Sequence, residues 1–425
     1  MRLRGAGGLF LALLTAVAAG QTPIDLQEAI RRARAANAHL PLPAVEVSIA
    51  REKRSEALAE RWLRVAVEGG FLYAPDNGSG YDPALTNLGE ARLQAVVRQP
   101  LYSGGALRAS ADRAGAAVEA AGARYRIAEK DLELEVRSRY SELLAALAEV
   151  STRRDGIERL QSYRSSLRGR QASGQGVATD LLKTEVRLAL EEAAISEAQQ
   201  RQDEARLTLN ELMGRPPVAS LDLAPLPPPT KPGSATDAAW EGAPEIAAAE
   251  AESRVAAADL TVARAERLPH LSLNADAGFW ASDTTHLGAS FWDRLWRDGG
   301  YSFSLVFAWP VWDRGTLRAR TAQAQLGLEL ARLRAEAARR DARLAWERAQ
   351  ATMSHLYREI EILSRAAPDA RDSYLQAESR YRGGAASALE VLDAYAASVE
   401  AAVRLSEATA RYRVAEAVAI RWSTP

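Results

Sequence analysis

Strand-like and helix-like patterns of apolar residues alternate along the chain, and each pattern occurs twice. Residues 271–279 read LSLNADAGF, in which almost every second position is apolar, and residues 65–73 repeat this alternation more weakly. A period of two predicts strands with one apolar and one polar face. Strands of this length can cross a bilayer when tilted, although the same pattern also fits a sheet on a soluble core. We expect strands at about 64–73, 91–101, 270–281 and 301–311.

Long stretches with helical spacing follow each pair of strands. No proline interrupts residues 106–173 or 316–367. Apolar residues recur there and later at steps of three and four, as in coiled coils, for example Val136, Tyr140, Leu143, Leu147 and Val150, and Leu389, Leu392, Ala396, Val399 and Val403. A helix over 106–173 would be about 100 Å long. We expect most charged side chains on solvated faces, and helices at about 40–61, 106–173, 177–214, 244–267, 316–382 and 387–422.

An internal duplication relates the two halves. Residues 100–108 read PLYSGGALR and residues 310–318 read PVWDRGTLR, an offset of 210 residues that also places Asp180 on Glu390. Because the stretch between the halves is rich in proline, we expect an extended connector there. The predicted organisation is a first repeat at 21–214, a linker at 215–243 and a second repeat at 244–425.

The first twenty residues have the features of an export signal. Arg2 and Arg4 precede a short apolar core, and small residues end at Gly20. No later run approaches the ~20 apolar residues of a membrane helix. If the mature chain crosses a membrane, we therefore expect strands to do so.

Composition excludes several classes of function. The 54 basic and 55 acidic side chains leave a net charge of −1, whereas nucleic-acid binders usually carry a basic excess. The chain has no cysteine, which excludes disulfides, thiolate metal sites and cysteine nucleophiles. The four histidines are scattered, and no phosphate-binding loop or nucleophile elbow is present. We expect no enzyme activity, no catalytic site, no metal and no cofactor.

The order of helix, β-hairpin, long helix and shorter helix, present twice, resembles the TolC-like outer-membrane factor family. PLYSGGALR resembles the family's strand-to-helix motif, and GGAASALEVLDA at 383–394 resembles its second hairpin tip. The resemblance implies a mixed, mainly α fold. Four strands cannot close a barrel, and residues alone leave dimer and trimer open. The resemblance implies a homotrimer, with a 12-stranded transmembrane β-barrel on a long periplasmic α-helical coiled-coil barrel.

The resemblance also implies a function. The chain would be the outer-membrane channel subunit of a tripartite efflux system, in the outer membrane of a Gram-negative-type cell with a large periplasmic portion. It would contact outer-membrane lipid and be a passive exit duct for solutes delivered by an inner-membrane pump and a periplasmic adaptor (membrane fusion) protein. The alternatives are an outer-membrane channel of type I protein secretion, or a soluble periplasmic coiled-coil scaffold or adaptor.

The candidate functional residues lie at the predicted hairpin tips and strand ends. By resemblance, the periplasmic entrance or gate comprises Asp180, Tyr381, Glu390 and Asp393, although position 386, basic in some relatives, is alanine here. Repeated by symmetry, acidic residues there would form rings that attract cations; the alternative is solvated surface acids. Glycines predicted to turn the hairpins and contact the adaptor are Gly174, Gly176, Gly383 and Gly384. The predicted strand-to-helix junctions contain Pro100, Gly104, Gly105, Pro310 and Gly315.

Overall fold

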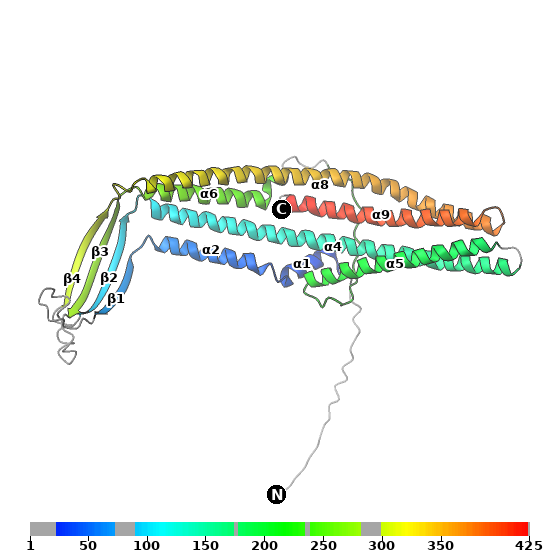
Figure 1. The fold of residues 1–425 in the computed structure, drawn as a ribbon, viewed down its shortest axis with the longest axis horizontal. Helices are drawn as coiled ribbons and strands as arrows, with labels where there is room; N and C mark the ends of the chain where they lie inside the picture. Colours follow the sequence, from blue (N-terminus) through cyan, green and yellow to red (C-terminus); the bar gives the residue numbers. More distant parts are fainter. Residues whose placement is uncertain (1–22, 73–89, 174–176, 234–238, 282–298, 424–425) are drawn as a thin grey trace, which may run out of the picture. The chain divides into compact units, whose positions relative to one another are not determined.

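The structure is mainly helical and contains one four-stranded sheet (Figure 1). It is a computed structural model that describes residues 23–72, 90–173, 177–233, 239–281 and 299–423. The predicted signal at 1–20, and Gly174 and Gly176, lie outside the described residues. The chain forms two compact units: unit 1 contains residues 1–36, 136–230 and 359–413, and unit 2 contains residues 37–135, 231–358 and 414–425. Each unit therefore takes segments from both predicted repeats.

The sheet of unit 2 is antiparallel and follows chain order. Its strands, which lie close to the predicted ranges, are β1 (Arg64–Leu72), β2 (Glu90–Tyr102), β3 (His270–Ala281) and β4 (Gly299–Ala308). β4 ends at residue 308, three residues before the predicted end. Pro310 has no N–H to donate, so the ladder of hydrogen bonds cannot continue past it.

One face of the sheet is apolar except for Gln99 of β2, which lies opposite Leu273. Val97 of β2 lies opposite Val65 of β1 and Ala275 of β3, and Ala275 in turn lies opposite Phe303 of β4. Residues that lie opposite each other share a face, so this apolar face also contains Val67, Leu93, Leu273, Tyr301, Leu305 and Phe307. Many of these side chains are exposed in the single chain, and Phe303 is 74% exposed. The opposite face contains polar residues, among them Arg64, Glu68, Arg98, Asn274, Asp276 and Ser302.

The same backbone conformation joins strand to helix in both repeats. Gly104 and Gly105 have φ angles of +62° and +90°, and Arg314 and Gly315 at the equivalent positions have +54° and +91°. A Cβ atom on Gly104 would lie 2.9 Å from the Cβ of Leu268. Two consecutive left-handed residues thus end each β-hairpin, which explains the glycines of the repeated motif.

The helices of unit 2 are joined mainly by small side chains and ion pairs. They are α2 (Pro41–Ala59), α6 (Pro244–Ala265) and parts of α4 (Ala106–Ala172), α8 (Thr316–Arg382) and α9 (Ala388–Trp422). Arg113 of α4 pairs with Asp259 of α6 at 2.8 Å. Near the end of α9, the buried Arg421 pairs with Asp131 at 2.6 Å and with Glu245 at 2.5 Å. Removing Asp131 or Glu245 would leave the buried guanidinium of Arg421 without one of its partners.

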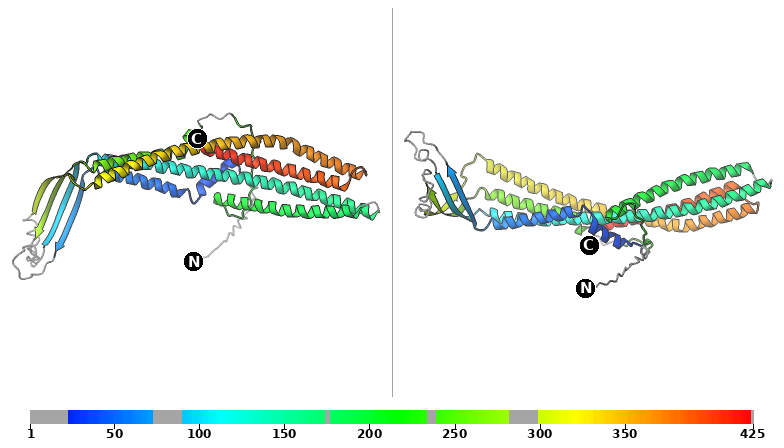
Figure 2. Two further views of the ribbon diagram at one scale, coloured as in Figure 1. Left: turned by 45° about the horizontal axis from the view of Figure 1, so that its top comes forward. Right: turned by 90° about the horizontal axis from the view of Figure 1, so that it is seen from below.

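Unit 1 contains two antiparallel helical hairpins, α4 with α5 (Ala178–Leu212) and α8 with α9 (Figure 2). It also contains α1 (Leu26–Ala36), which the sequence did not predict. Of the predicted coiled-coil positions, Val136, Tyr140, Leu143 and Val150 are buried and Leu147 is half-buried, whereas Leu389 is exposed. None of the helices within the described residues has both the length and the apolar character needed to cross a membrane.

Side chains of unit 1 hold the proline-rich linker in place. Ile24 forms a parallel bridge with Leu223, and the hydroxyl of Tyr140 lies 2.6 Å from the carbonyl oxygen of Ala224. The buried amide of Asn210 donates to the carbonyls of residues 217 and 219 at 3.0 and 2.9 Å. The linker is not extended throughout, because its last part forms the short 3-10 helix η1 (Ala239–Gly242) before α6.

The strand-to-helix junction predicts opposite effects of two glycine substitutions. Gly315→Ala places a Cβ on a residue at φ +91° and should lower the free energy of unfolding by about 1–2 kcal/mol. Gly122→Ala adds a methyl group within α4, where a Cβ meets no atom within 4 Å, and should raise that free energy by about 0.5–1 kcal/mol. Thermal unfolding followed by circular dichroism checks both, and a shift of the same sign for the two variants would contradict this interpretation.

Candidate functional site

The four predicted gate residues lie at helix ends within unit 1. Asp180 is in the first turn of α5, Tyr381 is in the last turn of α8, and Glu390 and Asp393 lie in the first two turns of α9. The structure brings Asp180 and Tyr381 to one cavity of about 440 Å³, which is also lined by Arg170 and Lys183. Glu390 and Asp393 do not line this cavity, and both are exposed.

Arg170 connects the end of α4 to the end of α8. Its Nη1 donates to the backbone carbonyl of Tyr381 at 3.0 Å, and its Cζ lies 5.1 Å from the centroid of the Tyr381 ring. Tyr163 of α4 also contacts this ring, in an edge-on arrangement with the ring centroids 5.3 Å apart. A guanidinium is favourable here for two reasons: it stacks on an aromatic ring, and it neutralises the partial negative charge of a helix C-terminus.

Glu390 closes its own hairpin. Its carboxylate pairs with Arg380 of α8 at 3.0 Å, and its N–H donates to the Ser387 hydroxyl oxygen at 3.2 Å. Between these residues the chain leaves the end of α8 through Gly384, which has a φ of +76°, and the N–H of Ala385 donates to the carbonyl of Arg380. This is the hydrogen bonding of a Schellman C-cap. Glu390 therefore stabilises the α8–α9 turn, and its charge has a cation beside it.

The two repeats differ at this place. Arg170 and Arg380 are equivalent in the duplication, as are Asp180 and Glu390. In the second repeat the arginine pairs with the acid of its own hairpin, whereas in the first it contacts Tyr381 of the other hairpin. The sequence aligned these residues, but no local pattern in it marks a contact that joins positions 170 and 381.

Four tyrosines, Tyr163, Tyr374, Tyr381 and Tyr395, form part of the core behind the helix ends. Tyr374 meets Tyr395 edge-on at 5.8 Å, and a Cβ on Gly156 of α4 would lie 2.4 Å from the Tyr395 hydroxyl oxygen. Burial, and secondarily the charge of Glu378, raise the pKa of Tyr374 to about 12. Burial likewise raises the pKa of Tyr163, with further contributions from Tyr381 and Asp180. Sequence reasoning found only Tyr381 of this group.

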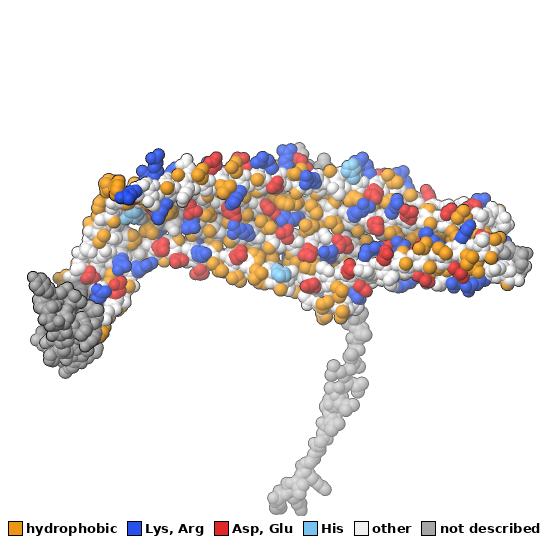
Figure 3. All heavy atoms as spheres, in the orientation of Figure 1, with side chains coloured by type: hydrophobic (Ala, Val, Ile, Leu, Met, Phe, Trp, Pro, Cys, Tyr) orange, Lys and Arg blue, Asp and Glu red, His pale blue; other side chains and the backbone are white. Residues whose placement is uncertain are grey.

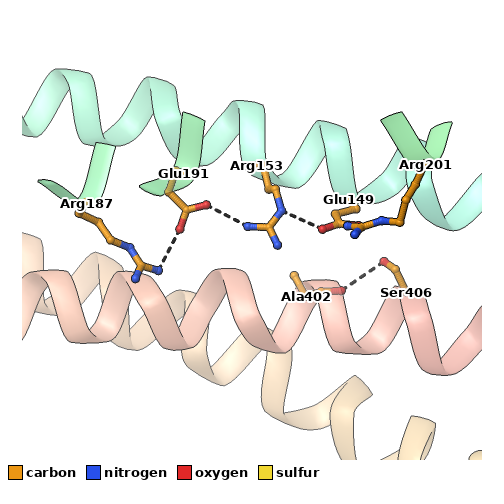
Figure 4. A network of polar contacts seen from close by, with 7 residues as sticks. All are labelled: Glu149, Arg153, Arg187, Glu191, Arg201, Ala402 and Ser406. Carbon is orange, nitrogen blue, oxygen red and sulfur yellow. Dashed lines mark hydrogen bonds and ion pairs between the residues drawn. The ribbon is translucent and has the colours of Figure 1, made fainter. Parts of the chain in front are cut away.

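A buried chain of charges lies beside this core, on α4 and α5 (Figure 4). Arg153 pairs with Glu149 at 2.8 Å and with Glu191 at 3.1 Å. Glu191 also pairs with Arg187 at 2.9 Å, and Glu149 with Arg201 at 2.6 Å. The residues Glu149 and Glu191 are 4% and 3% exposed. Charged residues mix with apolar ones along the helices seen in Figure 3, as expected of solvated faces, but these two carboxylates depart from that expectation.

No metal centre is present among the residues that the structure describes. Within them, no three His, Cys, Asp or Glu side chains are placed to hold an ion. The histidines whose positions are described lie in separate segments: His39 precedes α2, His270 begins β3 and His355 is in α8. The arrangement of the site offers charged and aromatic contacts between helix ends.

Comparison with known proteins gives one family match and several structural likenesses. A model of the family described as outer membrane efflux protein matches residues 25–215 and 235–419. The pyoverdine export outer membrane protein OpmQ of Pseudomonas putida strain KT2440 is 27% identical over 312 residues, 72% of this chain. That match spans 63% of the relative's length, so the chain corresponds to less than two thirds of it.

Two solved structures show the same fold. The outer membrane protein VceC of Vibrio cholerae has a TM-score of 0.82 and 19% identity, over 93% of this chain and 95% of its own. The open state of the MtrE outer membrane channel of Neisseria gonorrhoeae has a TM-score of 0.81 and 20% identity, over 93% of this chain and 88% of its own. At these identities the likeness concerns the arrangement of helices and strands.

Alkaline pH should loosen the tyrosine core. The pKa of Tyr374 is about 12 in the folded chain against 10.0 for the free side chain, so its contribution to stability is complete below pH 10 and is lost as the pH rises toward 12. Tyr374→Phe should therefore retain helicity to higher pH than the unmodified chain, measured by circular dichroism with tyrosinate absorbance in parallel. Tyr102→Phe, which changes an exposed ring, serves as the control. Identical alkaline unfolding of all three proteins would contradict the assignment.

Proposed function

Since the chain belongs to the outer membrane efflux protein family, we propose that it is the outer-membrane channel subunit of a tripartite efflux system. It would provide a passive exit duct for solutes delivered by an inner-membrane pump and a periplasmic adaptor. The observation that carries this proposal is the four-stranded sheet, which has one largely apolar face and one polar face. Such a sheet suits lipid on one side and a watery passage on the other.

The strand order supports an assembly of several chains. β1 and β4 are the outer strands of the sheet, and within the described residues neither has a partner along its second edge. Unpaired backbone groups are very costly in lipid, so an edge strand there needs another chain. We propose three copies, whose twelve strands would pair β4 of one subunit with β1 of the next.

Apolar stripes on the helices support the same assembly. In unit 1, α5 exposes Leu182, Val186 and Leu190, and α8 exposes Ile362 and Leu375. In unit 2, stripes of exposed apolar residues occur again, on α2 as Leu42, Val45 and Ile49, and on α8 as Leu326, Leu330 and Leu333. A cyclic oligomer needs two different, complementary surfaces on each chain. Both units offer such a pair, with α8 of one subunit facing α2 and α5 of the next.

The helix ends of unit 1 are the proposed periplasmic entrance. Asp180, Tyr381, Glu390 and Asp393 would line it, and the turn at Gly383 and Gly384 would contact the adaptor. Arg170 extends this proposal, because it occupies the cavity of Asp180 and Tyr381 and holds the end of α8. We propose that Arg170 supplies the basic group of the closed entrance, since Ala386 cannot.

The channel proposal predicts ion conduction with a cation preference set by Asp393. Asp393→Ala should reduce the cation preference more than Glu390→Ala, because Arg380 already neutralises Glu390. Reversal potentials across planar bilayers under a salt gradient measure this, with Glu400→Ala farther along α9 as a control. Purified protein that never conducts contradicts the channel proposal, and unchanged selectivity in both acidic variants contradicts the acidic entrance.

The gate proposal predicts that Arg170→Ala favours the open entrance. The variant loses a charge-assisted hydrogen bond and a cation–π contact, together about 2 kcal/mol, which corresponds to a roughly thirty-fold shift toward opening. Open probability in single-channel recordings measures this shift. Arg168→Ala is the matched control, because Arg168 lies on the same helix and pairs with Glu185 inside its own hairpin at 3.0 Å. Equal open probabilities in the two variants would show that Arg170 has no role in the gate.

A further inference from the structure

Helix α5 is apolar on two sides, and the more apolar side points outward. Its exposed side is the α5 stripe, defined as Leu182, Val186 and Leu190, which are 61%, 61% and 58% exposed. Its buried side in the same region contains Thr184, Leu188 and Glu191, and the partly buried Leu181 packs against the same core. Burying a large apolar side chain contributes about 1.5–3 kcal/mol. Hydrophobicity alone would therefore turn the α5 stripe inward, toward α4.

The buried charges supply the opposing preference. Glu149 and Arg153 lie on α4, and their side chains are only 6% and 18% exposed. In the observed facing, α5 covers them with Glu191 at 3.1 Å from Arg153 and with Arg201 at 2.6 Å from Glu149. A buried charge that loses its partners costs about 3–5 kcal/mol. Because a helix turns about its axis as one body, these pairs also decide which side of residues 182–190 faces inward.

We propose that the charge chain, defined as Arg187, Glu191, Arg153, Glu149 and Arg201, fixes the facing of α5 and keeps the α5 stripe available for a second copy of this chain (Figure 4). The occupant follows from the exposed apolar side chains of α8 in the same unit, Ile362 and Leu375. The choice of occupant rests on the proposed trimer, whereas the facing of α5 is a property of the single chain.

A single introduced cysteine can report the facing, because the chain has none of its own. Leu188 is buried, so Leu188→Cys should react slowly with a maleimide in detergent. We then add Arg153→Ala and Glu191→Ala, which remove the ion pairs that favour the observed orientation of α5. Because alanine is small, the buried side of α5 stays poor in large apolar residues. We expect labelling to accelerate on the order of tenfold, equivalent to about 1.4 kcal/mol, and assembled trimers to decrease.

Two further variants separate facing from general stability. With Arg153→Leu and Glu191→Leu, the facing surfaces of α4 and α5 become more apolar than before. Leu188→Cys should therefore stay protected from the maleimide although the charges are gone. A second variant adds three substitutions to the alanine variant: Leu182→Ser, Val186→Ser and Leu190→Ser. The α5 stripe is then polar and no longer favours turning inward, so Leu188→Cys should again be protected from the maleimide. Trimers should stay as scarce in this last variant as in the alanine variant, because the surface for the second copy is lost.

Several results would overturn the proposal. These are protection of Leu188→Cys in the alanine variant, equal labelling of the leucine and alanine variants, or failure of the serine substitutions to restore protection. If the alanine variant loses its helicity, a variant with Glu191→Gln takes its place in the labelling experiment. The proposal is then refuted if Leu188→Cys reacts in that variant at the same rate as in the chain with the charge chain intact. Absence of trimers or conductance in the unmodified chain refutes the proposed function instead, because the labelling pattern can be read on a single chain.

Discussion

Backbone hydrogen bonding along strand edges is the constraint on which the rest of the structure depends. A sheet with an apolar face can lie in lipid only if both of its outer strands find partners, and four strands in one chain leave two edges open. In the proposed assembly, other copies of the chain provide these partners. The same requirement explains why apolar side chains remain exposed on α2, α5 and α8, where a soluble monomer would cover them.

Much of the architecture could be predicted because it follows from local periodicity. The alternation in 271–279 places β3, and the proline-free stretches place α4 and most of α8. The duplication locates both strand-to-helix junctions, where Gly315 repeats the left-handed conformation of Gly105. Each of these features depends on residues that are near each other in the sequence, so its pattern can be recognised without knowing the fold.

Other features depended on partners far away in sequence and were not predicted. In the sequence, Glu191 and Arg170 cannot be distinguished from the charged residues of solvated helix faces. Their roles depend on contacts of the folded chain, with Arg153 for Glu191 and with Tyr381 for Arg170. Helix α1 is short and begins beside Ile24, which pairs with the linker. Leu389 follows the coiled-coil spacing but lies outside, because Ala388, Leu392 and Tyr395 fill the seam instead. Periodicity cannot choose between such neighbouring seams.

The mixing of both repeats within each compact unit has a consequence for how the chain is made. Unit 1 needs residues up to 413, and unit 2 needs residues beyond that, including the buried Arg421, which pairs with Asp131 and Glu245. A newly synthesised first repeat therefore has no complete unit to fold into, unlike the independent domains that mature one after another during translation. The chain stays unfinished until its last helix has emerged, and this delay suits a polypeptide that must be threaded across a membrane before it acquires its structure.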